Sequence, residues 1–161
     1  MLVNFHFPFA TFLEYNPSDI PILMASLFLG PVYGTVIALL VSIIQAATIS
    51  ASSGMYGFLM HFIASGVLAL VAGTVFKCMK KASSPVRLVS ALAVGGVVSA
   101  LLMIPANLIV TPLFLGSPVQ AVFELLIPAI IPFNFLKMAI NCTLSGIMFA
   151  AMKKTLANFY G

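Results

Sequence analysis

Charged side chains are scarce in this sequence: Asp, Glu, Lys and Arg together make up 6% of its 161 residues, whereas soluble domains carry about 25%. Hydrophobic residues make up 62%, and a soluble globule of this size could not bury so much apolar surface. The same composition excludes an intrinsically disordered chain. Because one span takes about 20 residues, we expect a single all-α membrane domain over residues 1–161, a compact bundle of about five transmembrane helices.

The motifs of known catalytic sites are also missing. The sequence has no HExxH, GxSxG, Walker A or Rossmann motif, and its three acidic residues and two histidines form no pair spaced for acid–base catalysis. Cys78 and Cys142 show no metal-binding spacing, and we expect both to pack within apolar helices. We therefore expect neither an enzyme nor a bound metal or cofactor, and active transport would need an energy source in a partner.

The basic residues predict the topology. The net charge is +4, and the basic residues gather in two short clusters at span ends, which is typical of membrane proteins rather than of nucleic-acid-binding proteins. The clusters are Lys77, Lys80, Lys81 and Arg87, and Lys153 with Lys154. The positive-inside rule places the 77–87 loop and the C-terminus in the cytoplasm, and the two spans between them agree with that parity. Residues 1–19, 50–54 and 111–132 then lie outside.

Apolar stretches interrupted by proline, glycine and polar residues predict the individual elements. The expected spans are 20–30, 31–50, 55–76, 88–110 and 133–152. The first is short, about 16 Å long, with Ser18 or Asp19 as its N-cap and Pro21 in its first turn. The expected connections are a loop at 1–19, a turn at 50–54, a linker at 83–87, a loop at 111–120 and a short interfacial helix at 120–131.

Three of the spans carry a small residue at every fourth position. The stripes are Ser65, Ala69 and Gly73; Ala91, Gly95 and Ser99; and Cys142, Gly146 and Ala150. Such stripes let helix backbones approach closely in a membrane. They indicate packing within the bundle, and docking of another subunit on one stripe is the alternative.

Lys137 lies about one turn into the last predicted span. A Lys at such a depth is costly and marks either a binding site or a buried pair, unless it extends to the interface. Asn134 and Asn141 share its helix face, and Asn107 lies near the outer end of the preceding span. These groups predict a largely apolar pocket with a few orienting polar groups. Its carboxamides suit an imide or nucleobase-like ring.

The alternative for these polar residues is purely structural. The Asn side chains would then bond across helices, and Lys137 would pair with an acid on the outer side, where Glu14, Asp19 and Glu124 are expected. His61 and Gln45 are further polar residues within spans. A single His in a membrane helix more often bonds a neighbouring helix than a ligand.

Three motifs resemble one family of membrane proteins. Leu13–Pro21 (LEYNPSDIP) is similar to the segment before the second helix of the riboflavin-specific S components of energy-coupling factor (ECF) transporters. Leu27–Pro31 (LFLGP) matches the Leu-Phe-x-Gly-Pro stretch that follows in this family. Pro132–Lys137 (PFNFLK) matches the Pro-Phe-Asn-x-x-Lys motif that opens its last helix.

The resemblance implies a function and partners. Such S components are small helical bundles that bind a vitamin from outside and associate with a membrane T component and two cytoplasmic ATPases. By similarity, Asn134 and Lys137 would hydrogen-bond the flavin ring, and Asn107 would assist. The loop at 5–19 would cover the pocket from outside. Its candidate contacts are Glu14, Tyr15 and Asn16. Riboflavin would thus be the transported ligand, not a cofactor.

The chain departs from the family pattern at two places. Family members have a first helix before the Phe-Pro segment, with an Ala-x-x-x-Ala motif that docks the T component. Here only five spans follow Met1, so we expect a misplaced start or a truncated relative. In the fourth helix, Gly57–Phe62 carries His61 where the family has Asn, so an altered substrate, another vitamin or a precursor, is an alternative to riboflavin. A membrane assembly subunit without a transport role is a further alternative.

Overall fold

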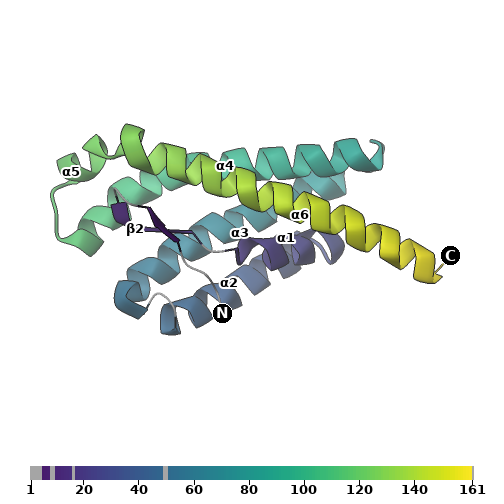
Figure 1. Cartoon of the computed structure of the whole chain (residues 1–161), viewed down its shortest axis with the longest axis horizontal. Helices are drawn as coiled ribbons and strands as arrows, with labels where there is room; N and C mark the ends of the chain where they lie inside the picture. Colours follow the sequence, from purple (N-terminus) through teal and green to yellow (C-terminus); the bar gives the residue numbers. More distant parts are fainter. Residues whose placement is uncertain (1–4, 8–9, 16, 49–50, 161) are drawn as a thin grey trace.

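The computed structural model describes residues 5–7, 10–15, 17–48 and 51–160. Within these ranges the chain forms a helical bundle with one small β-hairpin (Figure 1). The elements in chain order are β1 (Phe5–Phe7), β2 (Ala10–Tyr15), α1 (Asp19–Phe28), α2 (Pro31–Ala47), η1 (Ala51–Ser53), α3 (Gly54–Cys78), α4 (Ser84–Leu115), α5 (Val119–Glu124), the π-helical η2 (Leu126–Ile130) and α6 (Ile131–Tyr160).

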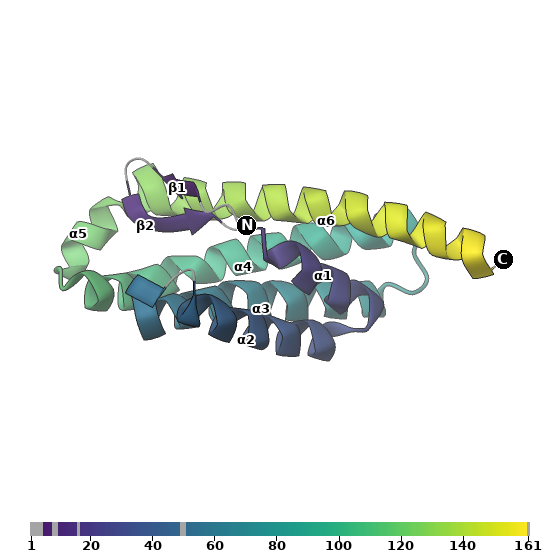
Figure 2. The same ribbon diagram turned by 60° about the horizontal axis from the view of Figure 1, so that its bottom comes forward.

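Helices α3, α4 and α6 run the full length of the bundle, and α4 packs against both α3 and α6 (Figures 1 and 2). Their 25, 32 and 30 residues are long enough to cross a bilayer at about 1.5 Å per residue. Helices α1 and α2 are apolar but shorter, with 10 and 17 residues. The predicted spans 20–30, 31–50 and 55–76 therefore correspond to α1, α2 and α3, with ends that differ by at most three residues.

The outer surface of the bundle is apolar. On α2, Val32 is 66% exposed and Ile44 is 61% exposed, and on α6 Ile147 is 62% exposed. So many exposed branched side chains would be unfavourable in water, whereas lipid accepts them. The surface, together with the lengths of the helices, identifies a multi-pass membrane protein.

The segment predicted as an irregular loop at 1–19 contains an antiparallel pair of strands. Phe5 is the register partner of Tyr15, and His6 that of Glu14. Figure 2 shows the hairpin beside the first half of α6. Proline had excluded a helix here, but it does not exclude extended backbone, and strand pairing satisfies backbone groups that a loop would leave to water. The loop prediction was therefore wrong for β1 and β2.

Helix α4 is longer than predicted at both ends. The expected linker at 83–87 was wrong from Ser84 onward, because the helix begins there. The expected loop at 111–120 is reduced to residues 116–118, because α4 continues to Leu115 and α5 begins at Val119. Pro85 occupies the first turn, where its missing N–H costs nothing. Pro112 lies inside the helix, and membrane helices tolerate such an internal proline. The helix ends at Gly116, whose φ of 61° is the left-handed conformation of a glycine cap.

The predicted interfacial helix at 120–131 is present as α5 followed by η2. Helix α6 then starts two residues earlier than expected and continues past the expected end at 152, to Tyr160. At the start of α1, Ser18 occupies the predicted cap position, but its side chain makes no capping hydrogen bond. Asp19 is the first helical residue and Pro21 lies in the first turn, as predicted.

The small-residue stripes pack inside the bundle. A Cβ placed on Gly95 of α4 would lie 2.8 Å from the Cβ of Ala72 on α3, and the Ser99 hydroxyl donates to the Ala64 carbonyl at 2.8 Å. On α6, the Cys142 thiol lies 3.4 Å from the Leu92 carbonyl. These contacts confirm packing within the bundle. Two residues differ from the expectation. Ala150, the last residue of the third stripe, is exposed, and so is Cys78, which we expected to pack within an apolar helix.

The two ends of the bundle differ in composition. One end, which we call the basic end, carries the α3–α4 turn and the C-terminal part of α6, where Lys153 donates to the Ser84 hydroxyl at 2.7 Å. The opposite end carries α5 and η2 (Figure 1), and we call it the pocket end. Both basic clusters therefore lie at the same end of the molecule, as their predicted common side of the membrane requires.

Candidate ligand pocket

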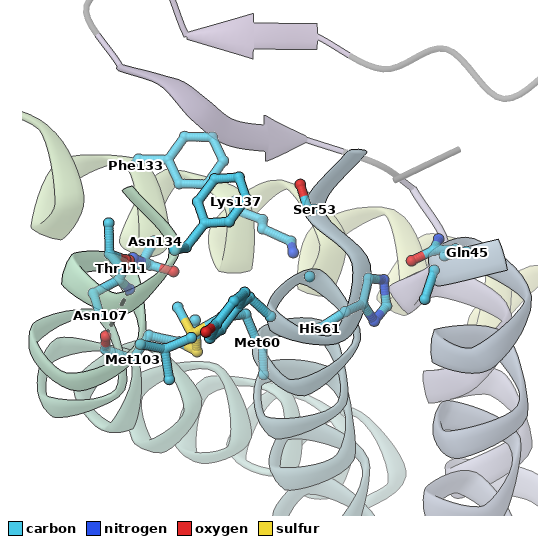
Figure 3. A pocket seen from close by; sticks show the side chains of 16 residues that line it. Gln45, Ser53, Met60, His61, Met103, Asn107, Thr111, Phe133, Asn134 and Lys137 are labelled. Carbon is cyan, nitrogen blue, oxygen red and sulfur yellow. Dashed lines mark hydrogen bonds between the residues drawn. The ribbon is translucent and has the colours of Figure 1, made fainter. Parts of the chain in front are cut away.

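A pocket opens between four helices at the pocket end (Figure 3). It contains about 840 Å³ of empty space, including the part open to solvent. The last turn of α2, the first turns of α3, the C-terminal part of α4 and the start of α6 supply its walls. The lining residues are Gln45, Ala46, Ser53, Tyr56, Gly57, Met60, His61, Ala64, Met103, Asn107, Val110, Thr111, Phe114, Phe133, Asn134 and Lys137.

The structure brings together the three residues that the sequence predicted as the centre of the site. Asn134 and Lys137 lie one turn apart at the start of α6, and Asn107 faces them from α4 (Figure 3). Asn107 is 1% exposed, Asn134 3% and Lys137 8%. Polar groups as deeply buried as these need partners, so their hydrogen bonds determine what each can still offer a ligand.

Each of the two carboxamides donates to the backbone carbonyl four residues before it, which lies in α4 for Asn107 and in η2 for Asn134. The Asn107 Nδ2 donates to the Met103 carbonyl at 2.7 Å, and the Asn134 Nδ2 donates to the Ile130 carbonyl at 2.8 Å. The Asn107 Oδ1 accepts from the Thr111 hydroxyl at 3.1 Å. Each amide nitrogen keeps a second N–H, and the Asn134 oxygen faces the pocket (Figure 3). The alternative that the Asn side chains bond across helices is therefore wrong for Asn107 and Asn134, but it holds for Asn141, which donates to Asp19 of α1.

Lys137 has a fully buried counterion. Its Nζ lies 3.8 Å from the Asp19 Oδ2, and Asp19 is 0% exposed. The Asn141 Nδ2 also donates to this oxygen at 2.7 Å, and the Ser65 hydroxyl donates to the other carboxylate oxygen. A buried carboxylate with this set of donors can stay ionised. Pairing with an acid and lining the pocket, which the sequence presented as alternatives, are thus both true of Lys137.

The buried carboxylate also connects the hairpin to the bundle. Tyr15 at the end of β2 donates its hydroxyl to the Asn141 Oδ1 at 2.9 Å, and Asn141 in turn donates to Asp19. Partial burial and the nearby Asp19 charge raise the pKa of Tyr15 above its ordinary value of 10.0. Of the other candidates in this segment, Glu14 lies in β2, and Asn16 lies outside the described residues.

The ring nitrogens of His61 are occupied by hydroxyl groups. Its Nδ1 lies 3.2 Å from the Ser42 Oγ and 3.1 Å from the Ser65 Oγ. Both hydroxyl protons are committed elsewhere, to the Ala38 carbonyl and to Asp19, so Nδ1 carries a proton and donates. In the neutral ring, Nε2 then accepts from the Ser18 hydroxyl at 3.0 Å. His61 lines the pocket, and its nitrogens join helices α1, α2 and α3.

Twelve of the sixteen lining residues were absent from the predicted site, among them the polar residues Thr111, Ser53 and Gln45. Thr111 was placed in a loop, and Ser53 in a turn. Gln45 was noticed only as a polar residue within a span, although it is 4% exposed and reaches the pocket. The signal that could have identified Gln45 was its rarity, because a carboxamide in an apolar helix needs a partner.

Aromatic and methionine side chains supply most of the remaining wall. Tyr56 and Phe114 face each other with ring centroids 6.0 Å apart, and Met60 and Met103 lie between the Asn107 side and the His61 side (Figure 3). Flat rings and flexible thioethers suit a planar aromatic ligand. No cluster of three or more His, Cys, Asp or Glu that could hold a metal occurs among the residues that the structure describes.

Comparisons with known proteins agree on one family. A sequence model described as "ECF transporter, substrate-specific component" matches residues 1–152. The riboflavin transporter FmnP of Bacillus subtilis (strain 168) is 28% identical over 162 residues, which cover 95% of this chain and 84% of FmnP. A solved structure titled "Structure and mechanism of the S component of a bacterial ECF transporter" superposes with a TM-score of 0.74 at 28% identity, over 97% of this chain and 85% of the other.

Proposed function

The chain belongs to the substrate-specific (S) components of ECF transporters, and on that premise we propose that it captures riboflavin or a close flavin from outside the cell. The family membership confirms the resemblance drawn from the three sequence motifs. The observation that supports a flavin most directly is the pocket itself, where Lys137, Asn134 and Asn107 converge on an apolar, aromatic-lined space. The similarity to a riboflavin transporter points to the same ligand.

The polar groups of the pocket match the imide edge of a flavin ring. That edge presents one N–H donor between two carbonyl acceptors. The Lys137 ammonium and the free N–H groups of Asn134 and Asn107 are donors for the carbonyls, and the Asn134 oxygen is an acceptor for the N–H. The hydrogen bond from the ammonium is the strongest of these, because it is charge-assisted. Tyr56, Met60 and Phe114 would cover the faces of the ring.

Uptake requires partner subunits in this proposal. The sequence has no nucleotide-binding motif, so a membrane T component and two cytoplasmic ATPases would supply the energy, as the family resemblance implies. The basic end would face the cytoplasm, because both basic clusters lie there. The pocket end and the hairpin would then face outside, where a vitamin is captured.

One observation favours a second candidate, an S component for a different vitamin or precursor. His61 stands where the family has Asn, and its ring nitrogens are turned to serine hydroxyls. A ligand that the family Asn would hydrogen-bond would find a different surface here. A membrane assembly subunit without a transport role is less favoured, because the small-residue stripes are used mainly within the bundle.

Titration of the purified protein in detergent with riboflavin, followed by flavin fluorescence, tests the proposal. We expect saturable quenching by the wild type. The Lys137→Met and Asn134→Leu variants should bind about 10- to 100-fold more weakly, since each loses a hydrogen bond to the ring. Lys80→Met, which removes an exposed Lys at the basic end, is the matched control and should bind as the wild type does.

Thermal unfolding of each variant separates loss of binding from loss of folding. A folded wild type that does not quench riboflavin would contradict flavin capture and would favour another vitamin. Equal binding by wild type and both pocket variants would contradict the assigned roles of Lys137 and Asn134.

A further inference from the structure

Gln45 is a buried carboxamide that has no hydrogen-bond partner within the described residues. It lies in the last turn of α2 and is 4% exposed. Neither its Nε2 nor its Oε1 makes a hydrogen bond to any part of the chain that the structure describes. An unpaired buried amide is costly, because it has given up water and received nothing in return. Such a group in a native protein calls for an explanation.

The position of Gln45 offers an explanation for this unpaired amide, because its side chain lines the pocket. Figure 3 shows its carboxamide beside His61, across the pocket from Asn107, Thr111 and Asn134. His61 is bound by serine hydroxyls, and Lys137 has Asp19 as its counterion. Asn107 and Asn134 each donate one N–H to a backbone carbonyl and keep the other N–H for a ligand. Gln45 differs from them, because both of its polar atoms remain free for a ligand.

The pocket therefore has two polar sides with an apolar strip between them. The Asn107 side offers carboxamides and the Lys137 ammonium. The Gln45 side offers one uncharged carboxamide, and the Ser53 hydroxyl also borders the pocket. A ligand that fits both sides has a planar apolar ring and a second, polar portion that is neutral rather than ionic. Hydroxyl groups suit the Gln45 side, because a carboxamide both donates to and accepts from them.

We propose that Gln45 is a ligand-contacting residue that hydrogen-bonds the hydroxylated chain of the ligand, while the Asn107 side holds its ring. This assignment rests on the proposed function, in which the ligand is riboflavin and the hydroxylated portion is its ribityl chain. The ligand then provides the partners that Gln45 lacks in the free protein. Gln45 is thus a specificity-determining residue and contributes nothing to the stability of the unliganded bundle.

Two ligands and two variants test the assignment. Lumiflavin has the same isoalloxazine ring as riboflavin, with a methyl group in place of the ribityl chain. Gln45→Leu removes the carboxamide and keeps a side chain of similar reach. Ser145→Ala is the matched control, because Ser145 is also buried without a hydrogen-bond partner among the described residues but does not line the pocket. Affinities for both flavins and the midpoint of thermal unfolding without ligand are measured for each protein.

We expect Gln45→Leu to weaken riboflavin binding about tenfold and to change the affinity for lumiflavin by less than about twofold. Its unfolding midpoint without ligand should equal or exceed that of the wild type, because an unpaired amide has been removed. Ser145→Ala should leave both affinities unchanged.

Three results would overturn the assignment. Unchanged riboflavin binding by Gln45→Leu would show that Gln45 does not contact the ligand, while flavin capture itself would stand. An equal loss for both flavins, or a lower unfolding midpoint, would show a structural role for Gln45. A folded wild type that binds neither flavin would overturn the proposed function and this assignment together.

Discussion

The two ends of the bundle are built from the same three long helices and have opposite interiors. At the basic end, helices approach through glycine and alanine, and aromatic rings close the core: Phe149 lies 4.6 Å from Phe28 and 5.3 Å from Phe76 between ring centroids. The Arg87 guanidinium covers the Phe76 ring at 3.7 Å. This end is dense and apolar, as a packed membrane interface should be.

At the pocket end, the same helices enclose polar groups and empty space. Asp19, Asn107 and Asn141 are at most 1% exposed, and the pocket separates α4 and α6 from α2 and the start of α3. Side-chain size accounts for the contrast. Small apolar residues let the helices approach closely toward the basic end, whereas large aromatic and methionine side chains line the space between the helices at the pocket end. Substitutions in the pocket wall are therefore expected to change ligand binding, whereas substitutions at the close helix contacts toward the basic end should change stability alone.

The largest expected effect comes from the buried charge at the pocket end. Asp19→Leu leaves Lys137 without its counterion and deprives Ser65 and Asn141 of their acceptor. We expect the free energy of unfolding in detergent to fall by about 3–5 kcal/mol. Glu124→Leu, which replaces an exposed acid at the same end, should change it by less than about 0.5 kcal/mol.

Adding Lys137→Met to Asp19→Leu should restore part of the lost stability, because no buried charge then remains unpaired. A double variant that is less stable than Asp19→Leu alone would contradict the pairing of these two residues.

The next effect tests close packing toward the basic end. In Gly95→Ala, the new Cβ would lie 2.8 Å from the Ala72 Cβ and 3.1 Å from its backbone nitrogen. We expect a loss of about 1–3 kcal/mol, despite the better helix propensity of alanine, because backbone must move. Gly146→Ala is the control, since its Cβ would meet only the tip of Leu92 at 3.2 Å, and a flexible tip can shift. The riboflavin affinity, measured together with the free energy of unfolding, should be unchanged in both variants. If the two variants were equally stable, the result would argue against a tight α3–α4 contact.

The smallest effect concerns the hairpin at the pocket end. Tyr15→Phe removes the hydrogen bond to Asn141 and should cost about 0.5–1.5 kcal/mol near pH 8. Because the pKa of Tyr15 is raised in the folded protein, its contribution is complete below about pH 10 and is lost as the pH rises through the raised pKa. The difference between wild type and Tyr15→Phe should therefore shrink above about pH 10.

Unfolding curves at several pH values measure this difference. Tyr33→Phe, at an exposed position of α2, is the control and should match the wild type near pH 8. A difference that grows with pH would contradict the donor role of the Tyr15 hydroxyl.

Much of the fold was predictable because the membrane imposes simple rules on composition. Apolar length placed α1, α2 and α3 to within three residues, and the rarity of polar residues identified Asn107, Asn134 and Lys137 as neighbours in a pocket. The predictions failed where proline was interpreted as a helix end. Pro85 and Pro112 both lie inside α4, because a first turn does not use the N–H and a membrane helix retains its remaining backbone bonds.

The partners of the polar residues were not predictable from spacing. Asp19 and Lys137 are far apart in the sequence and meet only because α1 packs beside α6. The same holds for His61, which reaches Ser18 and Ser42 from distant parts of the chain, and for Gln45, whose significance comes from having no partner among the described residues.

Composition and pattern are enough to assign the class of protein, its helical spans and the polar residues that stand out among apolar ones, because the membrane requires long apolar helices and makes each polar side chain costly. Which of these side chains satisfy one another, and which remain available to a ligand, follows from the way the helices pack. Hydrogen bonds and ion pairs depend on distances of a few ångströms between helices, and those distances are set by packing rather than by position along the chain.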